Sequence, residues 1–305
     1  MILLKNNAYL LIALLSASSF FISCKDKSSK DPQTITSGNI SIVVDETLAP
    51  IIQDQLAIFE STYSDASIEL IERPEKLAIN HLLSDSSKVA VLSRKLTPEE
   101  EKFFESKKIV PRTTRFAIDG IAVITNKSNP RSEIHIEELF KVLRGEPSSV
   151  TSLVFDNPNS SSIRLLKELA GVDSLPQSGV YALKTNADII EYVHENSQAI
   201  GVIGINWLVQ PAKEFSDMVE EIKVLGVKNL AGRNGDDGFY YPSQDNLALG
   251  QYPLARELYI VNVTGARGLG FGFASFVGGE RGQRLVLKSG LLPDSIPPRE
   301  IIIRK

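Results

Sequence analysis

Hydroxyl side chains at predicted helix starts are the residues of this chain best suited to hold a small anion. Five hydroxyls lie in such places, and they are Thr47, Ser93, Ser160, Ser161 and Ser162. Free N–H groups at a helix start, together with the positive end of the helix dipole, attract anions. The alternative for each hydroxyl is a plain N-cap, which stabilises a helix by about 1 kcal/mol without a ligand. Arg94 and Asp119 add a cation and an acceptor, and their presence favours the anion site.

Catalytic and cofactor motifs are absent from the sequence. The chain has no Gly-x-Ser-x-Gly elbow, no His-Glu-x-x-His and no phosphate loop with Gly-Lys-Ser/Thr. His81, His135 and His194 lie far apart without the spacing of metal ligands. Phe273 stands where the last glycine of a Gly268-x-Gly270-x-x-Gly nucleotide motif would be. We therefore expect a binding protein rather than an enzyme, with no metal and no cofactor.

The elements that must position these hydroxyls alternate between short apolar runs and amphipathic stretches from Asn39 onward. This alternation is typical of an α/β sheet with crossover helices. The predicted strands are Ile40–Val44, Val89–Leu92, Phe116–Thr125, Leu153–Phe155, Ala199–Ile203, Ile222–Val227 and Leu258–Val263. Predicted helices include 52–63, 136–143, 162–170, 187–196 and 273–288, and Thr97 begins another as its N-cap. Ligands of open α/β sheets collect at the carboxyl ends of strands, which is where the hydroxyls lie.

The N-terminal segment has the layout of an export signal. Lys5 is followed by an uncharged apolar stretch from Ala8 to Ile22 and then by Cys24, the single cysteine. At about 15 residues this stretch is shorter than the roughly 20 that a membrane span needs. Residues 21–24 resemble a bacterial lipobox, which implies cleavage after residue 23 and a lipid on Cys24. The polar residues that follow predict a flexible tether over 24–37.

Composition and charge limit the class of protein further. The chain has 305 residues, 43% of them hydrophobic, and a formal net charge of −4. This length permits two medium domains, each able to bury its own core. An acidic chain argues against nucleic acid as a partner. A small anion remains compatible with it, because such a site is local and is made largely of backbone dipoles.

Several segments resemble, in order, the phosphate-binding proteins of the phosphate-specific ABC importer. Residues 91–97, with Ser93-Arg94-Lys95-Leu96-Thr97, are similar to the Ser-Arg-x-Leu-Thr segment of that family. Residues 119–124 read Asp-Gly-Ile-Ala-Val-Ile, as the family does, and residues 252–256 resemble its Tyr-Pro-Leu-x-Arg segment. Residues 45–50 and 159–162 stand in the places of its first and third ligand loops. The resemblance covers nearly all of the chain after the predicted signal.

The resemblance implies a two-lobe periplasmic-binding-protein fold of the type II kind, with two mostly parallel sheets and a ligand cleft between them. One lobe would hold residues 38–116 and 224–305, and the other 117–223. Inorganic phosphate would be bound by Thr47, Ser93, Arg94, Asp119, Ser160, Ser161 and Ser162. Arg94 would fork onto two oxygens. Asp119 would accept from the P–OH group of phosphate, which sulfate lacks, and so discriminate between the two anions.

The same resemblance implies the partners, and two other classes stay open. A hydrolase, which would need a nucleophile and a base, is one of them. Hinge closure on phosphate would present a monomer, anchored through the lipid on Cys24, to an ABC permease in the inner membrane. Two loops depart from the family pattern, since Asp45-Glu46 replaces small residues and the third loop has lost both glycines. These departures keep a second hypothesis open, in which the cleft binds another oxyanion or the protein is a sensor or scaffold.

Overall fold

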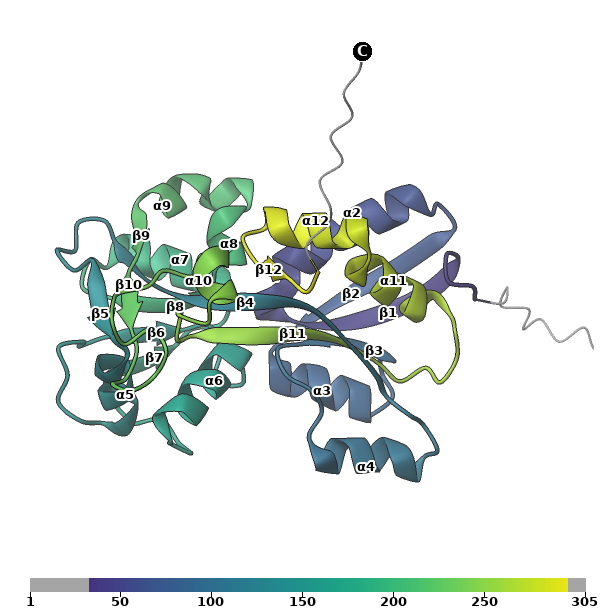
Figure 1. Cartoon of the computed structure of the whole chain (residues 1–305), viewed down its shortest axis with the longest axis horizontal. Coiled ribbons are helices and arrows are strands. Elements are labelled where there is room, and N and C mark those ends of the chain that lie inside the picture. Colours follow the sequence, from purple (N-terminus) through teal and green to yellow (C-terminus); the bar gives the residue numbers. More distant parts are fainter. Residues whose placement is uncertain (1–32, 296–305) are drawn as a thin grey trace, which may run out of the picture. The chain divides into compact units, whose positions relative to one another are not determined.

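The computed structural model of the chain describes residues 33–295 (Figure 1). The predicted export signal (1–23), the lipidation site at Cys24 and the tether up to residue 32 lie outside the described residues. Among the residues that are described, none of the helices is both long and apolar enough to cross a membrane.

Strands and helices alternate along the described chain, as the sequence predicts. The strands are β1 (Gly38–Asp45), β2 (Ala66–Arg73), β3 (Val89–Leu92), β4 (Arg112–Asn126), β5 (Glu133–His135), β6 (Leu153–Phe155), β7 (Val180–Ala182), β8 (Ile200–Gly204), β9 (Ile222–Val224), β10 (Gly226–Lys228), β11 (Ala255–Asn262) and β12 (Leu292–Pro293). The α-helices are α2 (Ala49–Thr62), α3 (Glu75–Leu83), α4 (Pro98–Ser106), α5 (Ile136–Arg144), α6 (Ser161–Ala170), α7 (Asn186–Glu195), α8 (Asn206–Val209), α9 (Ser216–Glu220), α10 (Gln244–Ala248), α11 (Leu269–Gly278) and α12 (Glu280–Lys288). Two 3₁₀ turns, η2 (Glu46–Leu48) and η3 (Lys213–Phe215), complete the set.

One mixed sheet of ten strands runs through the described residues, in the order β2-β1-β3-β11-β4-β8-β6-β7, with β9 and β12 also paired to β4. The long strand β4 joins its two halves, as Figure 1 shows. Its residues 112–120 pair with β11, and its residues 121–126 pair with β8 and β9. We call the part with β1, β2, β3, β11 and β12 the first half and the part with β6–β9 the second half.

Strand direction differs between the middle and the flanks of the sheet. Strand β1 is parallel to β2 and β3, and β6 is parallel to β7 and β8. Strands β4 and β11, which carry the chain between the halves, are antiparallel to their neighbours. The sequence analysis expected two mostly parallel sheets, whereas the described residues form one mixed sheet of ten strands. Most of the predicted strands are apolar throughout. That pattern reports burial on both faces, whichever direction the neighbouring strand takes.

Helices cover both faces of each half, and each face has its own apolar core. In the first half α2, α11 and α12 pack on one face around Phe59 and Phe273, and α3 and α4 pack on the other around Leu82 and Phe104. In the second half α5, α6 and α10 cover one face, and α7, α8 and α9 cover the other. Because successive side chains of a strand point to opposite faces, adjacent apolar residues such as those of β1 enter different cores.

Core packing assigns the segment before β11 to the second half. Five buried residues of this segment, Leu225, Val227, Leu247, Tyr252 and Leu254, lie in the core of the second half. The Tyr252 hydroxyl donates to the backbone oxygen of Ile121 at 2.5 Å, and β10 pairs with β5. The sequence analysis expected residues 224–305 to lie in one lobe with residues 38–116. The chain instead returns to the first half at β11.

Local helix signals of the sequence agree with the structure at most termini. Thr97 and Glu100 form a capping box at the start of α4, and Ser160 is the N-cap of α6. The predicted helix 273–288 is two helices, α11 and α12, which meet at Gly278-Gly279. The extended backbone of Gly279 ends α11, and Gly282 lets α12 pack closely against it, since a Cβ there would lie 2.4 Å from the backbone oxygen of Phe276.

Candidate functional site

The loop after β1 turns sharply and buries its polar side chains. Asp45 is the N-cap of η2, and its Oδ1 accepts from the Thr47 backbone N–H at 3.4 Å. Asp45 and Thr47 are both fully buried. Strand β8 ends beside this turn, and a Cβ on its last residue, Gly204, would lie 3.3 Å from the backbone oxygen of Thr47. The small residue therefore lets the second half of the sheet approach the turn closely.

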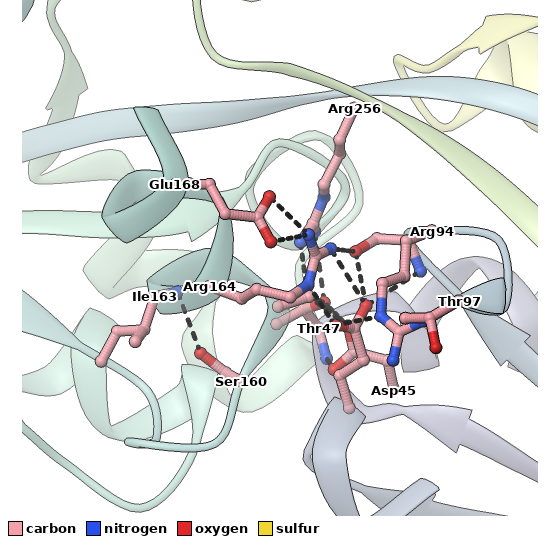
Figure 2. A network of polar contacts seen from close by, with 12 residues as sticks. Asp45, Thr47, Arg94, Thr97, Ser160, Ile163, Arg164, Glu168 and Arg256 are labelled. Carbon is pink, nitrogen blue, oxygen red and sulfur yellow. Dashed lines mark hydrogen bonds and ion pairs between the residues drawn. The ribbon is translucent and has the colours of Figure 1, made fainter. Parts of the chain in front are cut away.

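The start of α6 faces the same turn from the second half. Ser160 caps the helix and accepts from the Ile163 N–H at 3.4 Å, as Figure 2 shows. Ser161 and Ser162 follow in the first helical turn and are fully buried. The Ser162 hydroxyl finds no hydrogen-bond partner among the described residues. One of the three serines is thus a cap, and the other two direct buried hydroxyls inward.

Arg256 brings these parts together. It lies directly opposite Asp119 in the antiparallel pairing of β11 with β4, and its Nε donates to Asp119 Oδ2 at 2.8 Å. Its Nη1 donates to Ser161 Oγ at 2.6 Å and its Nη2 to Thr47 Oγ1 at 3.2 Å. Only 4% of Arg256 is exposed. We call Asp45, Thr47, Asp119, Ser161 and Arg256 the buried cluster.

The Asp45 carboxylate completes the buried cluster. Its Oδ2 accepts from Thr47 Oγ1 at 2.9 Å and also from Ser161 Oγ. Asp45 belongs to the first half and Ser161 to the second, so the carboxylate joins the two halves in the way that a bound anion would. The remaining oxygen of Asp119, Oδ1, is buried without a hydrogen-bond partner among the described residues.

A second group of charged side chains bridges the halves beside α3 and α6. Arg164 donates through Nε to Glu75 Oε1 and through Nη2 to Ser93 Oγ at 2.9 Å. The Ser93 hydroxyl donates to Glu75 Oε2 at 2.8 Å. Arg94 directs its fork at Glu100, with both N–O distances at 2.8 Å, and its Nε lies 3.8 Å from Glu75. We call Glu75, Ser93, Arg94 and Arg164 the cleft cluster.

Two cavities open between the halves. One, of about 850 Å³, is lined on the first half by α3 and Arg94 and on the second half by the start of α6, with Ser160 and Arg164. The other, of about 620 Å³, has α2 on one side and α8 with Trp207 on the other. The Trp207 Nε1–H donates across to the backbone oxygen of Thr47 at 3.0 Å. Polar side chains of both halves thus face both openings.

Electrostatics separates the two clusters. Burial, reinforced by the charge of Glu75 and opposed by Arg256, raises the pKa of Asp45 to about 7. Burial also raises the pKa of Glu46 to about 8, with Asp156 adding to the shift, and raises the pKa of Asp119 despite Arg256. For Glu75 burial acts in the same direction, but Arg164, Ser93 and Arg94 together outweigh it, and the pKa falls below its ordinary value. The buried cluster is poor in positive charge, whereas the cleft cluster is rich in it.

The residues that the sequence selected divide among these places. Thr47, Asp119 and Ser161 meet in the buried cluster, and Ser93 and Arg94 belong to the cleft cluster. Arg94 pairs with Glu100, and Arg256 is the guanidinium that the buried hydroxyls contact. Sequence reasoning missed Arg256, Arg164 and the inward direction of Asp45 as parts of the site. For Arg256 a signal existed, because it ends the Tyr-Pro-Leu-x-Arg segment.

Two α/β halves joined by crossing strands, with convergent polar groups between them, define a two-lobed binding protein. The chain belongs to the PBP superfamily, since residues 29–281 match the family model described as PBP superfamily domain. Its fold is therefore the two-lobe, periplasmic-binding-protein-like fold that the sequence predicted.

Several proteins that this chain matches carry names from phosphate transport. A protein of Borreliella burgdorferi named phosphate-binding protein PstS is 24% identical over 301 residues, which cover 93% of this chain and 97% of the relative. A Clostridium perfringens protein, assigned as a phosphate ABC transporter substrate-binding protein and solved with bound phosphate, superposes with a TM-score of 0.68 at 20% identity, over 85% of this chain and 100% of that one. An ABC-type phosphate transport receptor of Vibrio cholerae gives 0.62 at 19% identity, over 84% and 100%.

Proposed function

We propose that this protein captures inorganic phosphate between its two lobes and delivers it to the permease of an ABC importer. The observation that carries the proposal is the meeting of Thr47, Asp119 and Ser161 with Arg256 at the junction of the two sheet halves. Hydroxyls and a guanidinium are suitable donors for phosphate oxygens, and a carboxylate is a suitable acceptor for its proton. The names of the relatives and their nearly full-length match support the same assignment.

The proposed ligand set keeps the residues selected from the sequence and adds one. Asp119 Oδ1, which is free of hydrogen bonds among the described residues, would accept from P–OH, and the equally free Ser162 hydroxyl would donate to a phosphate oxygen. Arg256 would supply positive charge beside the hydroxyls of Thr47 and Ser161. Arg94 would reach the anion only by leaving Glu100. The full proposed set is Thr47, Ser93, Arg94, Asp119, Ser160, Ser161, Ser162 and Arg256.

Binding would be coupled to hinge closure. We assign residues 38–120 and 255–295 to one lobe and 121–254 to the other, because the apolar cores divide there. The two connections are then the middle of β4 at Gly120 and the start of β11. A ligand that contacts donors of both lobes stabilises the closed state, and the permease would recognise that state. The protein would act as a monomer without turnover of its ligand.

The N-terminal segment supports an extracytoplasmic, membrane-anchored protein. Residues 1–23 would be removed on export, and a lipid on Cys24 would hold the folded part through the tether. This assignment concerns residues outside the described range and rests on the sequence alone. Incorporation of a labelled fatty acid into the native chain, and its loss in Cys24→Ser, would establish the anchor.

Calorimetric titration with phosphate and then with sulfate tests the proposal. The detergent-solubilised chain is unfolded and refolded first, so that any carried anion is removed. We expect tight phosphate binding and a weak response to sulfate. Asp119→Asn should reduce the preference for phosphate by about tenfold or more, because the acceptor for P–OH is lost. Arg94→Ala should weaken the binding of both anions. Lys102→Ala, which removes an exposed cation on α4, should weaken the binding of neither.

A second candidate function has a specific observation in its favour. The Asp45 carboxylate already accepts hydrogen bonds from the hydroxyls of Thr47 and Ser161. A protein that bridges its own lobes in this way could use the cleft for another oxyanion, or act as a sensor or scaffold. Absence of heat with both anions, or unchanged affinities in Asp119→Asn and Arg94→Ala, would reject the phosphate site and leave this second function.

A further inference from the structure

The hydroxyl hydrogens of the buried cluster are already in use. Thr47 Oγ1 and Ser161 Oγ each accept from Arg256, at 3.2 and 2.6 Å, and each donates to the same oxygen of Asp45. A hydroxyl group owns one hydrogen. Neither hydroxyl therefore has a hydrogen left for a bound anion while the Asp45 carboxylate is ionised.

From this arrangement, and on the basis of the proposed phosphate function, we infer that Asp45 is a specificity-determining residue that competes with phosphate for the buried cluster. Phosphate binds there together with a proton that Asp45 takes up. Once protonated, Asp45 no longer requires both hydroxyl hydrogens, and it brings an O–H group that can itself donate to a phosphate oxygen. An ionised Asp45 would face the incoming anion across a buried, low-dielectric space, where like charges repel strongly.

The surroundings of Asp45 favour uptake of that proton. Charged groups act on it from several sides: Glu46 on η2, Glu75 on α3, Asp156 in the loop after β6 and Arg256 on β11, which also binds Asp119. A single guanidinium is thus surrounded by several carboxyls. Burial and Glu75 raise the pKa of Asp45 to about 7, against the opposing effects of Arg256 and Ser161. The negative charge of phosphate would raise it further.

The simpler role for Asp45 is that of an N-cap for η2. Its cap contact, from Thr47 N to Oδ1, is long at 3.4 Å, whereas its other oxygen makes the contacts to the cluster. Asparagine is as good an N-cap as aspartate. Asp45→Asn therefore preserves the cap and shape but removes the charge, and it separates the two roles.

The experiment measures the phosphate Kd at pH 6 and pH 8 for the wild-type chain, for Asp45→Asn and for Glu69→Gln, an exposed carboxylate on β2. At pH 8 only about a tenth of Asp45 is protonated if its pKa is near 7, so wild type should bind about tenfold more weakly than Asp45→Asn. At pH 6 the two should differ less than about twofold. Phosphate itself titrates in this range. This contribution cancels in the ratio of the Kd of wild type to the Kd of Asp45→Asn at the same pH. Glu69→Gln should follow wild type.

Three outcomes decide the inference. A ratio that grows toward pH 8 supports it. Measurable phosphate binding with the same ratio at both pH values overturns the role of Asp45 and leaves the phosphate function intact. Absence of phosphate binding by every protein at both pH values overturns the proposed function and, with it, this inference. Asp45→Ser, another good N-cap, carries the same expectation and replaces Asp45→Asn if that variant does not fold.

Discussion

The buried cluster and the cleft cluster use the same side-chain types to bridge the two halves, yet they shift the pKa values of their acids in opposite directions. Each joins an arginine, a carboxylate and hydroxyl groups across the interface. In the cleft cluster both Arg164 and Arg94 lie near Glu75, and the pKa of Glu75 is lowered. In the buried cluster Arg256 serves both Asp45 and Asp119, and the pKa of each acid is raised.

The difference teaches that the ratio of guanidinium to carboxylate decides the protonation state, once both groups are buried. Glu75 and Asp45 are each almost inaccessible, at 2% and 0% exposure. Desolvation raises the pKa of both acids. Two arginines overcome it at Glu75, and one shared arginine does not at Asp45. The cleft cluster is therefore an ion-pair bridge, whereas in the buried cluster the pKa of Asp45 is raised to about 7.

The largest expected effect tests the buried side of this comparison. Arg256→Ala should lower the free energy of unfolding by about 3–5 kcal/mol, because it leaves buried carboxylates without their cation. Denaturant unfolding at pH 7 measures the loss. Arg284→Ala, which removes an exposed pair with Glu280, should cost less than about 1 kcal/mol. Equal losses in the two variants would show that the buried cluster has no special dependence on its arginine.

An intermediate effect is expected in the cleft cluster. Arg164→Ala should lower the free energy of unfolding by about 2 kcal/mol, since Glu75 and Ser93 lose charged hydrogen bonds while Arg94 stays nearby. Thermal or denaturant unfolding beside Lys167→Ala, a variant on the same helix, measures the difference. A loss as large as that of Arg256→Ala would contradict the distinction between the two clusters.

The third effect is a pH dependence of opposite sign for the two regions, and it is the smallest when expressed per pH unit. Asp45 keeps its proton up to about pH 7 in the folded chain and loses it near its ordinary pKa when unfolded, so stability falls as pH rises from 5 to 7, by about 1 kcal/mol per unit. The contribution of Glu75, whose pKa is lowered, is present above its ordinary pKa and is lost in acid. The free energy of unfolding should be largest near pH 5, and Asp45→Asn should reduce its decline from pH 5 to 7. Stability that increases from pH 5 to 7 would contradict this.

Much of the fold could be predicted because both faces of the sheet are covered. Strands buried on both faces are continuous apolar runs, and two of them, β3 and β6, have the predicted bounds. Strand β2 was missed, since this edge strand begins with alternating buried and exposed residues and includes three charged side chains, Glu69, Glu72 and Arg73. The lobe to which residues 225–254 belong depends on tertiary packing, which no local pattern reports.

The candidate site could be predicted only in part. Its key contacts depend on the register between strands β4 and β11 and on which of several nearby groups each arginine binds. The pairing that sets Arg256 opposite Asp119 is a property of two strands 137 residues apart. Arg94 follows Ser93, a predicted ligand residue, yet its guanidinium donates two hydrogen bonds to the carboxylate of Glu100 on α4. The sequence shows that Asp45 replaces a small residue, but whether its carboxylate faces inward follows only from the geometry of η2.

One contact described above gives this protein an optical reporter of its own. Trp207 is the single tryptophan of the 305-residue chain, and its indole N–H donates from α8 to the backbone oxygen of Thr47. Parting of the lobes would break that bond and place the ring in water. With excitation selective for tryptophan, the intrinsic fluorescence of the unlabelled chain should therefore follow opening and closing of the lobes in real time, reported from beside Thr47.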